Sequence, residues 1–585
     1  MSVAALLRAG ASAFAMLTVL SAGKAHATGV DMNMDMGTGE AAGHEQSASQ
    51  SYPPTYFAHP HYVGVIYAHI ALMVIAWVFV LPIAVMLSLA RSRYTVASRV
   101  LFSMTNAVGI VFSIIYNANT PDLYPNNAHH KIGWIVTSVA SAQLIVGMVG
   151  HFAGPVRGRR ACTSSPESSA FMPIPADLSD EEYRMSNDSG QGTEPDTESL
   201  HSNSLSTLDG VGDDNDQHLP LHARHKEYQH DDELVDDISP PSRASSWAAN
   251  HAVRVISSAA WRYIDLASQI VDRIILPFGF IAFTTGIVTL GRFFEGPGVF
   301  GGLAHWVKGG VFFWLGLFTL GRWSGSFGQL GWAWNARPPP VRHQQWSQWR
   351  PSAEFVESAL ILFYGSTNIF LEHLGGWGGE WSAQDLEHMA ITVLFIGGGL
   401  CGILVESTRI RDLLNTTVTD APPAETSPDE ERQLRIPPTT YGFSLNPIPA
   451  LVILLLGFMM SSHHQSTMIS TMVHKQWGNL LLGASFARGL TYVLVYLRPP
   501  KSVLPSRPPT ELLASFGLIA GGIIFMASSS DTVDGMIHYD LDAMFMYTVT
   551  MGIVGILMAW ELVVLAIKGW ATRKERQTVP RFAYA

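Results

Sequence analysis

Residues 459–488 read MMSSHHQSTMISTMVHKQWGNLLLGASFAR and join the end of one apolar run to the beginning of the next. The first run, 448–460, ends shortly before His463 and His464, and His474 opens the second run. Two membrane helices joined in this way bring three imidazoles to one face of a membrane. The pattern recurs along the chain, so the sequence predicts a membrane protein with a layer of histidines on one side.

The overall composition also indicates a polytopic membrane protein. Hydrophobic residues make up 48% of the 585 residues and charged residues only 14%, whereas soluble proteins usually carry about 25% charged residues. The net charge of −11 and the lack of a basic field outside short loops argue against nucleic-acid binding. The two cysteines, Cys162 and Cys401, form neither a disulfide framework nor a CxxC redox pair.

Eleven apolar segments each approach the about 20 residues that a helix needs to cross a bilayer. Arg and Lys gather in alternate links between these segments, which indicates that those links are cytoplasmic. The sequence thus predicts an all-α, polytopic helical membrane protein with eleven transmembrane helices after a signal peptide. The expected spans are 63–90, 98–118, 131–152, 274–292, 304–321, 354–371, 387–406, 446–461, 475–497, 511–527 and 543–567.

Targeting and polar segments surround the spans. A short apolar core followed by Ala25-His26-Ala27 is typical of a cleavable secretory signal, with an uncleaved anchor as the alternative. The protein is therefore expected in a membrane of the secretory pathway (plasma membrane, vacuole or endoplasmic reticulum), with its N-terminus lumenal and its C-terminus cytoplasmic. The expected divisions are a signal peptide (1–27), a disordered lumenal tail with Met and His (28–58), a three-helix block (59–153), a disordered acidic cytoplasmic loop (154–246), an amphipathic interfacial helix (247–273), an eight-helix block (274–570) and a basic cytoplasmic tail (571–585).

The three-helix block resembles the cytochrome b-561 family. The residues that carry the resemblance are His69, Met73, Trp77, Pro82 and Arg91 in the first span and His130, Gly133, Trp134 and Gln143 in the third. The resemblance implies a b-type haem with His69 and His130 as axial ligands, and His129 belongs to the same candidate cofactor site. The second span has no histidine, and Asn106 falls where another ligand would stand. At most one haem site is therefore expected in this block.

A second group of polar side chains lies on the same predicted face of the eight-helix block. Imidazoles and carboxylates of this kind suit Zn, Cu or Fe, or a proton-coupled site. Simple placement in the interfacial belt is the alternative for any one histidine. The candidate metal ligands are Glu372, His373, His388, His463, His464 and His474. With the preceding block, this layout resembles the fungal YTP-like membrane protein family.

Other residues inside the spans are interpreted structurally. Glu357 and Arg488 need partners if they face the interior, but Glu357 is expected nearer the cytoplasm, so a direct pair between them is not predicted. Glycines are expected at close helix contacts. These glycines are Gly397, Gly398, Gly399, Gly483, Gly552 and Gly555.

The favoured function is a haem- or metal-binding redox protein whose histidine sites lie at the lumenal face of the bilayer. A transporter or channel for a metal ion or proton is the alternative, and a non-catalytic membrane scaffold is a third. An electron donor or a metal ion is the expected partner. No Walker motif or GxSxG elbow appears in a suitable context, so no catalytic residue is predicted and enzymatic activity is left open.

Overall fold

The computed structural model describes residues 52–163, 259–296, 298–339, 351–371, 381, 383–420, 429, 432–433, 435–462 and 465–578. A compact unit, Pro54–Ala585, contains nearly all of them. Regular structure within these ranges is helical, without strands. The predicted signal peptide, most of the segments 28–58 and 154–246, and the side chains of Glu372, His373, His463 and His464 lie outside the described residues.

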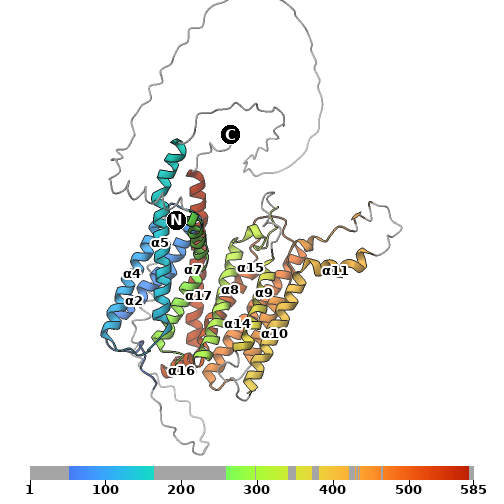
Figure 1. Ribbon diagram of the computed structural model, residues 1–585. Helices are drawn as coiled ribbons and strands as arrows, with labels where there is room; N and C mark the ends of the chain where they lie inside the picture. The colour runs from blue at the N-terminus through green and yellow to red at the C-terminus, as the bar shows by residue number, and fades with distance from the viewer. Residues whose placement is uncertain are drawn as a thin grey trace, which may run out of the picture. The chain divides into compact units, whose positions relative to one another are not determined.

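Each of the eleven predicted spans coincides with a helix, so the predicted fold class is confirmed (Figure 1). Within the described part of the chain, nine helical segments are long and apolar enough to cross a membrane. They comprise α2 (Val63–Val74), η1 (Ile75–Val80) and α3 (Leu81–Leu89) as one segment, α4 (Thr95–Asn119), α5 (Ala128–Thr163), α7 (Ala259–Gly291), α8 (Gly298–Ser324), α10 (Ala383–Glu406), α14 (Met468–Leu497), α15 (Pro509–Ala527) and α17 (Ala543–Thr578). The other two predicted spans are α9 (Ala353–Leu371) and α13 (Ile448–Ser462), and shorter helices are η2 (Gly328–Leu330), α11 (Thr408–Thr419), η5 (Thr439–Gly442) and α16 (Ser530–His538).

The first span shows how a proline is accommodated inside a membrane helix. Pro82 has no backbone N–H to donate to the carbonyl of Val78, and its ring crowds that turn. The helix widens just before it into the π-helical turn Ile75–Val80. The indole Nε1 of Trp560 in α17 donates to the freed carbonyl of Val78 at 2.8 Å. A buried acceptor is thereby satisfied, and the last span is fixed to the first.

An N-terminal bundle is formed by α2–α3, α4, α5 and α7. Its core contains Ala76, Phe102, Val136 and Ile275, one from each of the four spans. The helix α7 thus packs with the first three spans, although it follows the long acidic loop and was expected to open the second block. It begins at Ala259 and continues unbroken to Gly291, so residues 259–273 are its first turns rather than part of a separate helix.

The C-terminal bundle is built around α15. In its most apolar stretch 78% of the residues are buried, against 17–33% for the other eight spanning segments, so α15 is the central helix. Close approach to α8 depends on Gly522, because a Cβ there would lie 2.5 Å from the backbone nitrogen of Phe313. Gly399 is likewise pressed against Leu362 of α9, as predicted. The same expectation is wrong for four other glycines, because nothing lies within 4 Å of a Cβ at any of them: Gly397, Gly483, Gly552 and Gly555.

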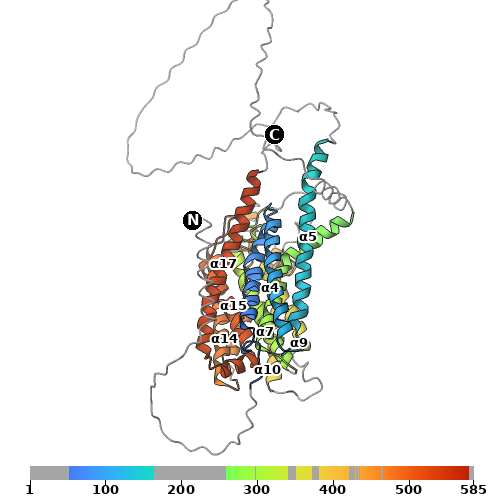
Figure 2. The ribbon, with the colours of Figure 1, turned by 90° about the vertical axis from the view of Figure 1, so that its left-hand side faces the viewer.

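The contacts between loops define two ends of the helices. At one end Tyr124 Oη donates to the carbonyl of Phe293 at 2.8 Å, and Asp531 accepts from the backbone N–H of Phe294 at 2.6 Å. We call this the histidine end. At the other, the arginine end, Glu575 accepts from the backbone N–H of Arg93 at 3.1 Å, and α5 and α17 extend past their neighbours there (Figure 2). The loops alternate between the ends as the span order requires; that the arginine end is cytoplasmic stays a prediction.

Candidate functional site

Two imidazoles face each other near the histidine end of the N-terminal bundle. His69 comes from α2 and His129 from the start of α5, and their ring centroids are 6.4 Å apart with an interplanar angle of 72°. The Nδ1 of His69 bonds the carbonyl of Gly109 at 2.9 Å, and the Nδ1 of His129 bonds the carbonyl of Ala282 at 3.1 Å. A carbonyl oxygen can only accept, so each Nδ1 carries the proton and each Nε2 keeps a lone pair.

His130, the predicted partner of His69, does not take part in this pair. Its side chain is exposed and its ring lies 6.5 Å from that of Trp134, one turn further along α5. Consecutive residues of an α-helix point about 100° apart, so only one of His129 and His130 can face the bundle interior. The ring that faces His69 is therefore that of His129 and not that of His130, and the cofactor site itself stays a prediction.

The position of the His129 ring depends on α7. The helix α5 packs against α7, and α2 packs against α4, so the two histidines reach toward each other across the bundle. A Cβ on Gly286 would lie 3.0 Å from Cε1 of His129. The missing side chain at Gly286 therefore leaves the space in which the ring lies against α7.

Polar side chains fill the interior of the N-terminal bundle between the histidine pair and the arginine end. Asn106, at the position of the absent second-span ligand, accepts from Trp77 Nε1 at 2.9 Å and donates to Thr137 at 3.4 Å. Further toward the arginine end, buried Arg99 and Asp272 are 2.5 Å apart. Asn106 thus bonds Trp77 and Thr137, while Asp272 accepts from Arg99 and Gln143, so these buried polar groups have partners within the bundle.

The C-terminal bundle has its own pair of imidazoles at the histidine end. His305 of α8 and His474 of α14 have ring centroids 6.0 Å apart. Each Nδ1 bonds the carbonyl four residues earlier, that of Gly301 at 2.9 Å and that of Ser470 at 2.8 Å. His305 was not among the predicted metal ligands, although its place at the start of a span put it on the same face.

The predicted metal cluster is only partly visible, because four of its six members lie outside the described residues. Of the other two, His474 is buried and His388 lines the same cavity as His474. Among the residues that the structure describes, no three His, Cys, Asp or Glu side chains are placed to hold one metal ion. The six-membered cluster therefore stays a prediction.

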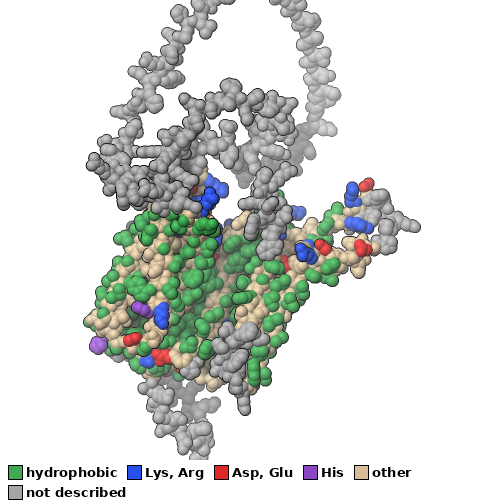
Figure 3. All heavy atoms as spheres, viewed as in Figure 1, with side chains coloured by type: hydrophobic (Ala, Val, Ile, Leu, Met, Phe, Trp, Pro, Cys, Tyr) green, Lys and Arg blue, Asp and Glu red, His purple; other side chains and the backbone are tan. Residues whose placement is uncertain are grey.

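A large cavity begins beside these histidines. It has a volume of about 2270 Å³, is lined by His305, His388 and His474, and extends to Glu357. Asp534 of α16 lines the cavity outside the spans, at the histidine end, and burial together with nearby Asp531 raises the pKa of that carboxyl. Most of the wall is apolar, and one face of the molecule is correspondingly hydrophobic and hollowed in its middle (Figure 3).

A buried network of charges stands where the cavity meets the arginine-end half of the C-terminal bundle. Arg488 contacts Glu357 at 3.2 Å and Glu511 at 2.9 Å, and Arg322 contacts Glu357 at 3.1 Å and Glu354 at 3.0 Å. All five side chains are at most 7% exposed. The expectation that Glu357 and Arg488 do not pair is thus wrong.

Sequence reasoning missed Arg322, Glu354 and Glu511, which lie near the ends of their helices. The signal was available, because Glu354 and Glu511 are the first residues of two predicted spans and Arg322 directly follows a third. Charged residues at such depth are costly to bury and require partners. The network ties α8, α9, α14 and α15 together and contains three carboxylates against two guanidinium groups. Such a network holds the bundle in one arrangement and leaves an excess of carboxylate beside the cavity.

Comparison with known proteins finds one family match on each side of the segment 154–277. Residues 278–569 match the family described as Protein YTP1-like, C-terminal, and residues 50–153 match a domain of unknown function, DUF2427. No solved structure matches. The resemblance to cytochrome b-561 stays a prediction.

Several yeast membrane proteins are similar to this chain. "Uncharacterized membrane protein C3B8.06" of Schizosaccharomyces pombe is 32% identical over 523 residues, which are 87% of this chain and 94% of the relative. "Uncharacterized membrane protein YCR061W" of Saccharomyces cerevisiae is 40% identical over 302 residues, 49% of this chain and 45% of the relative. "Protein YTP1" of the same yeast is 26% identical over 194 residues, 33% of each chain. The chain therefore belongs to the YTP1-like family of fungal membrane proteins.

Proposed function

We propose that the protein is a redox membrane protein that holds one b-type haem between His69 and His129. The facing pair of imidazoles carries this proposal. His69 and His129 would hold the iron through their Nε2 atoms, and histidine is a usual ligand of haem iron. Their ring centroids are 6.4 Å apart, so both imidazoles lie close enough to reach one metal ion between them.

The donor chemistry of the pair also fits. Histidine is a common axial ligand of haem iron. A ligating imidazole usually donates its other N–H to a carbonyl or carboxylate, which fixes the tautomer and strengthens the ligand. Both His69 and His129 make such a bond through Nδ1. These residues would hold and orient the group, while the apolar side chains around them would keep water away.

One haem at one end limits what the protein can do with electrons. The bound iron would supply one-electron exchange between its ferric and ferrous states. The arginine-end half of the same bundle is occupied by the Arg99–Asp272 pair and its partners. We therefore expect electron exchange with a partner at the histidine end and not transfer across the whole bilayer.

The proposal is tested by the visible spectrum of the full-length protein, purified after expression with ample haem supply. We expect a Soret band that shifts on reduction by dithionite and about one haem per chain. Colourless protein that is correctly folded would remove this function.

The cavity supports a second candidate, a pathway for a proton or cation. It connects three histidines near one end with Glu357 of the buried charge network, and His and carboxylate chains are typical of ion pathways in membranes. Under this function, haem-free protein in proteoliposomes would conduct protons or metal ions, and Glu357→Gln would stop the flux. Haem-free protein that carries neither current nor ions would exclude both functions.

A further inference from the structure

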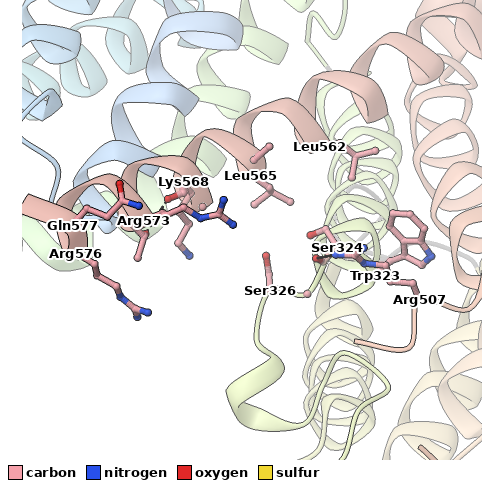
Figure 4. A pocket seen from close by; sticks show the side chains of 14 residues that line it. Trp323, Ser324, Ser326, Arg507, Leu562, Leu565, Lys568, Arg573, Arg576 and Gln577 are labelled. Carbon is pink, nitrogen blue, oxygen red and sulfur yellow. Dashed lines mark hydrogen bonds between the residues drawn. The ribbon is translucent and has the colours of Figure 1, made fainter. Parts of the chain in front are cut away.

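A basic pocket opens at the arginine end, on the side of α17 away from the N-terminal bundle. It has a volume of about 1220 Å³ and lies between the last turns of α17, the turn after α8 and the loop before α15 (Figure 4). The lining residues that matter for the argument are Ser326, Arg507, Leu565, Lys568, Arg573 and Arg576.

The pocket carries an unbalanced positive charge. Arg507, Lys568, Arg573 and Arg576 line it, and none of the residues that line it is acidic. None of these four cations forms an ion pair within the described part of the chain. Glu575, their neighbour on α17, binds Arg93 and Ser92 on another side of the helix. The pocket therefore offers four positive charges to an anionic ligand.

The chemistry of the wall changes along α17. Leu562 and Leu565 face the pocket from inside the span, and Lys568, Arg573 and Arg576 follow toward the helix end. The leucines could contact the acyl chain of a lipid, while the cations that follow them along the helix could bind its phosphate. A free phosphate ion would use only the cationic half.

Two residues on the wall opposite α17, Arg507 and Ser326, could bind a phosphate headgroup. The guanidinium of Arg507 lies over the ring of Trp323, 6.0 Å from its centroid, which holds the charge at the mouth of the pocket. The Ser326 side chain, in the turn after α8, lines the pocket and is labelled in the space between Arg507 and α17 (Figure 4). Its hydroxyl offers one donor to phosphate oxygens.

We propose that this pocket binds the phosphate headgroup of an anionic phospholipid, with the acyl chains along Leu562 and Leu565. Basic pockets between membrane helices on the cytoplasmic side are typical sites for such headgroups, and the arginine end is the predicted cytoplasmic end. The inference is independent of the haem proposal. Lys568, Arg573 and Arg576 would contribute most of the binding, each worth about a fivefold change in affinity.

The test uses full-length protein in nanodiscs of phosphatidylcholine with a small fraction of fluorescent phosphatidylserine. We expect the triple variant Lys568→Gln/Arg573→Gln/Arg576→Gln to bind the probe about 100-fold more weakly. The triple variant Arg409→Gln/Arg498→Gln/Lys501→Gln removes as many cations from exposed positions outside the pocket and should bind almost as wild type does. Equal losses in the two variants would overturn the proposal in favour of diffuse surface attraction.

Two further measurements keep the result interpretable. Ser326→Asp places a carboxylate opposite α17 without altering that helix and should also weaken binding, so a folding defect of α17 cannot imitate the effect. Inorganic phosphate is added at millimolar concentration as a competitor. Full displacement of the lipid probe by phosphate, or wild-type binding in the Ser326→Asp protein, would contradict a lipid site.

Discussion

Purified His69→Ala and His129→Ala proteins are each expected to lack the Soret band, whereas His130→Ala should retain it. The two essential rings face each other at 6.4 Å and each is oriented by a backbone carbonyl. Removing either ring takes away one of the two axial ligands, and a b-type haem is held largely through those bonds. The measurement is the haem absorbance per chain for the three variants and the wild type.

The His130→Ala protein is a matched control, because His130 adjoins His129 on α5 but is exposed and turned toward Trp134. It changes the same residue type, one position away, in the same turn. Loss of haem in His130→Ala together with its retention in His129→Ala would show that the helix is rotated from the arrangement described. Retention of haem in all three variants would place the ligands elsewhere.

Arg488→Met is expected to lower the free energy of unfolding by about 3–5 kcal/mol, because it leaves buried Glu511 without its counter-charge and Glu357 with Arg322 alone. Glu357 and Glu511 both pair with Arg488, and their side chains are 7% and 0% exposed. Arg498→Met, at the exposed end of the same helix, should change stability by less than about 1 kcal/mol. Thermal or denaturant unfolding in detergent, followed by tryptophan fluorescence, measures both.

A double-variant cycle separates the pair from general damage to the helix. If Arg488 acts by neutralising Glu511, then adding Glu511→Gln to Arg488→Met should recover part of the loss, since no uncompensated charge then remains at that position. Strictly additive losses in the two single variants would show that the two side chains do not depend on each other.

The membrane fold was predictable because it depends on local composition. A run of apolar residues long enough for a bilayer must form a helix, since backbone groups have no other partners in lipid. The direction in which an individual side chain points was harder to predict from the sequence. Whether His129 or His130 faces inward is decided by Gly286 and the carbonyl of Ala282, and α7 follows α5 only after the long acidic segment.

The Glu357–Arg488 pair was missed because depth in the membrane was judged from the span boundaries. At about 1.5 Å per residue, Arg488 lies roughly 14 Å from the arginine end of α14 and Glu357 roughly 6 Å from the start of α9. The two side chains nevertheless meet at 3.2 Å, so the ends of α9 and α14 cannot lie at the same depth. Stagger is a property of packing, for example of the close contacts at Gly399 and Gly522, and no single span reveals it.

The most direct test of the account is low-temperature electron paramagnetic resonance of the oxidised full-length protein. Two imidazoles on one iron produce a low-spin ferric signal, and His129→Ala should convert it to a high-spin signal or abolish it. A high-spin signal in the wild type, or a low-spin signal that is unchanged in His129→Ala, would contradict an iron shared by His69 and His129.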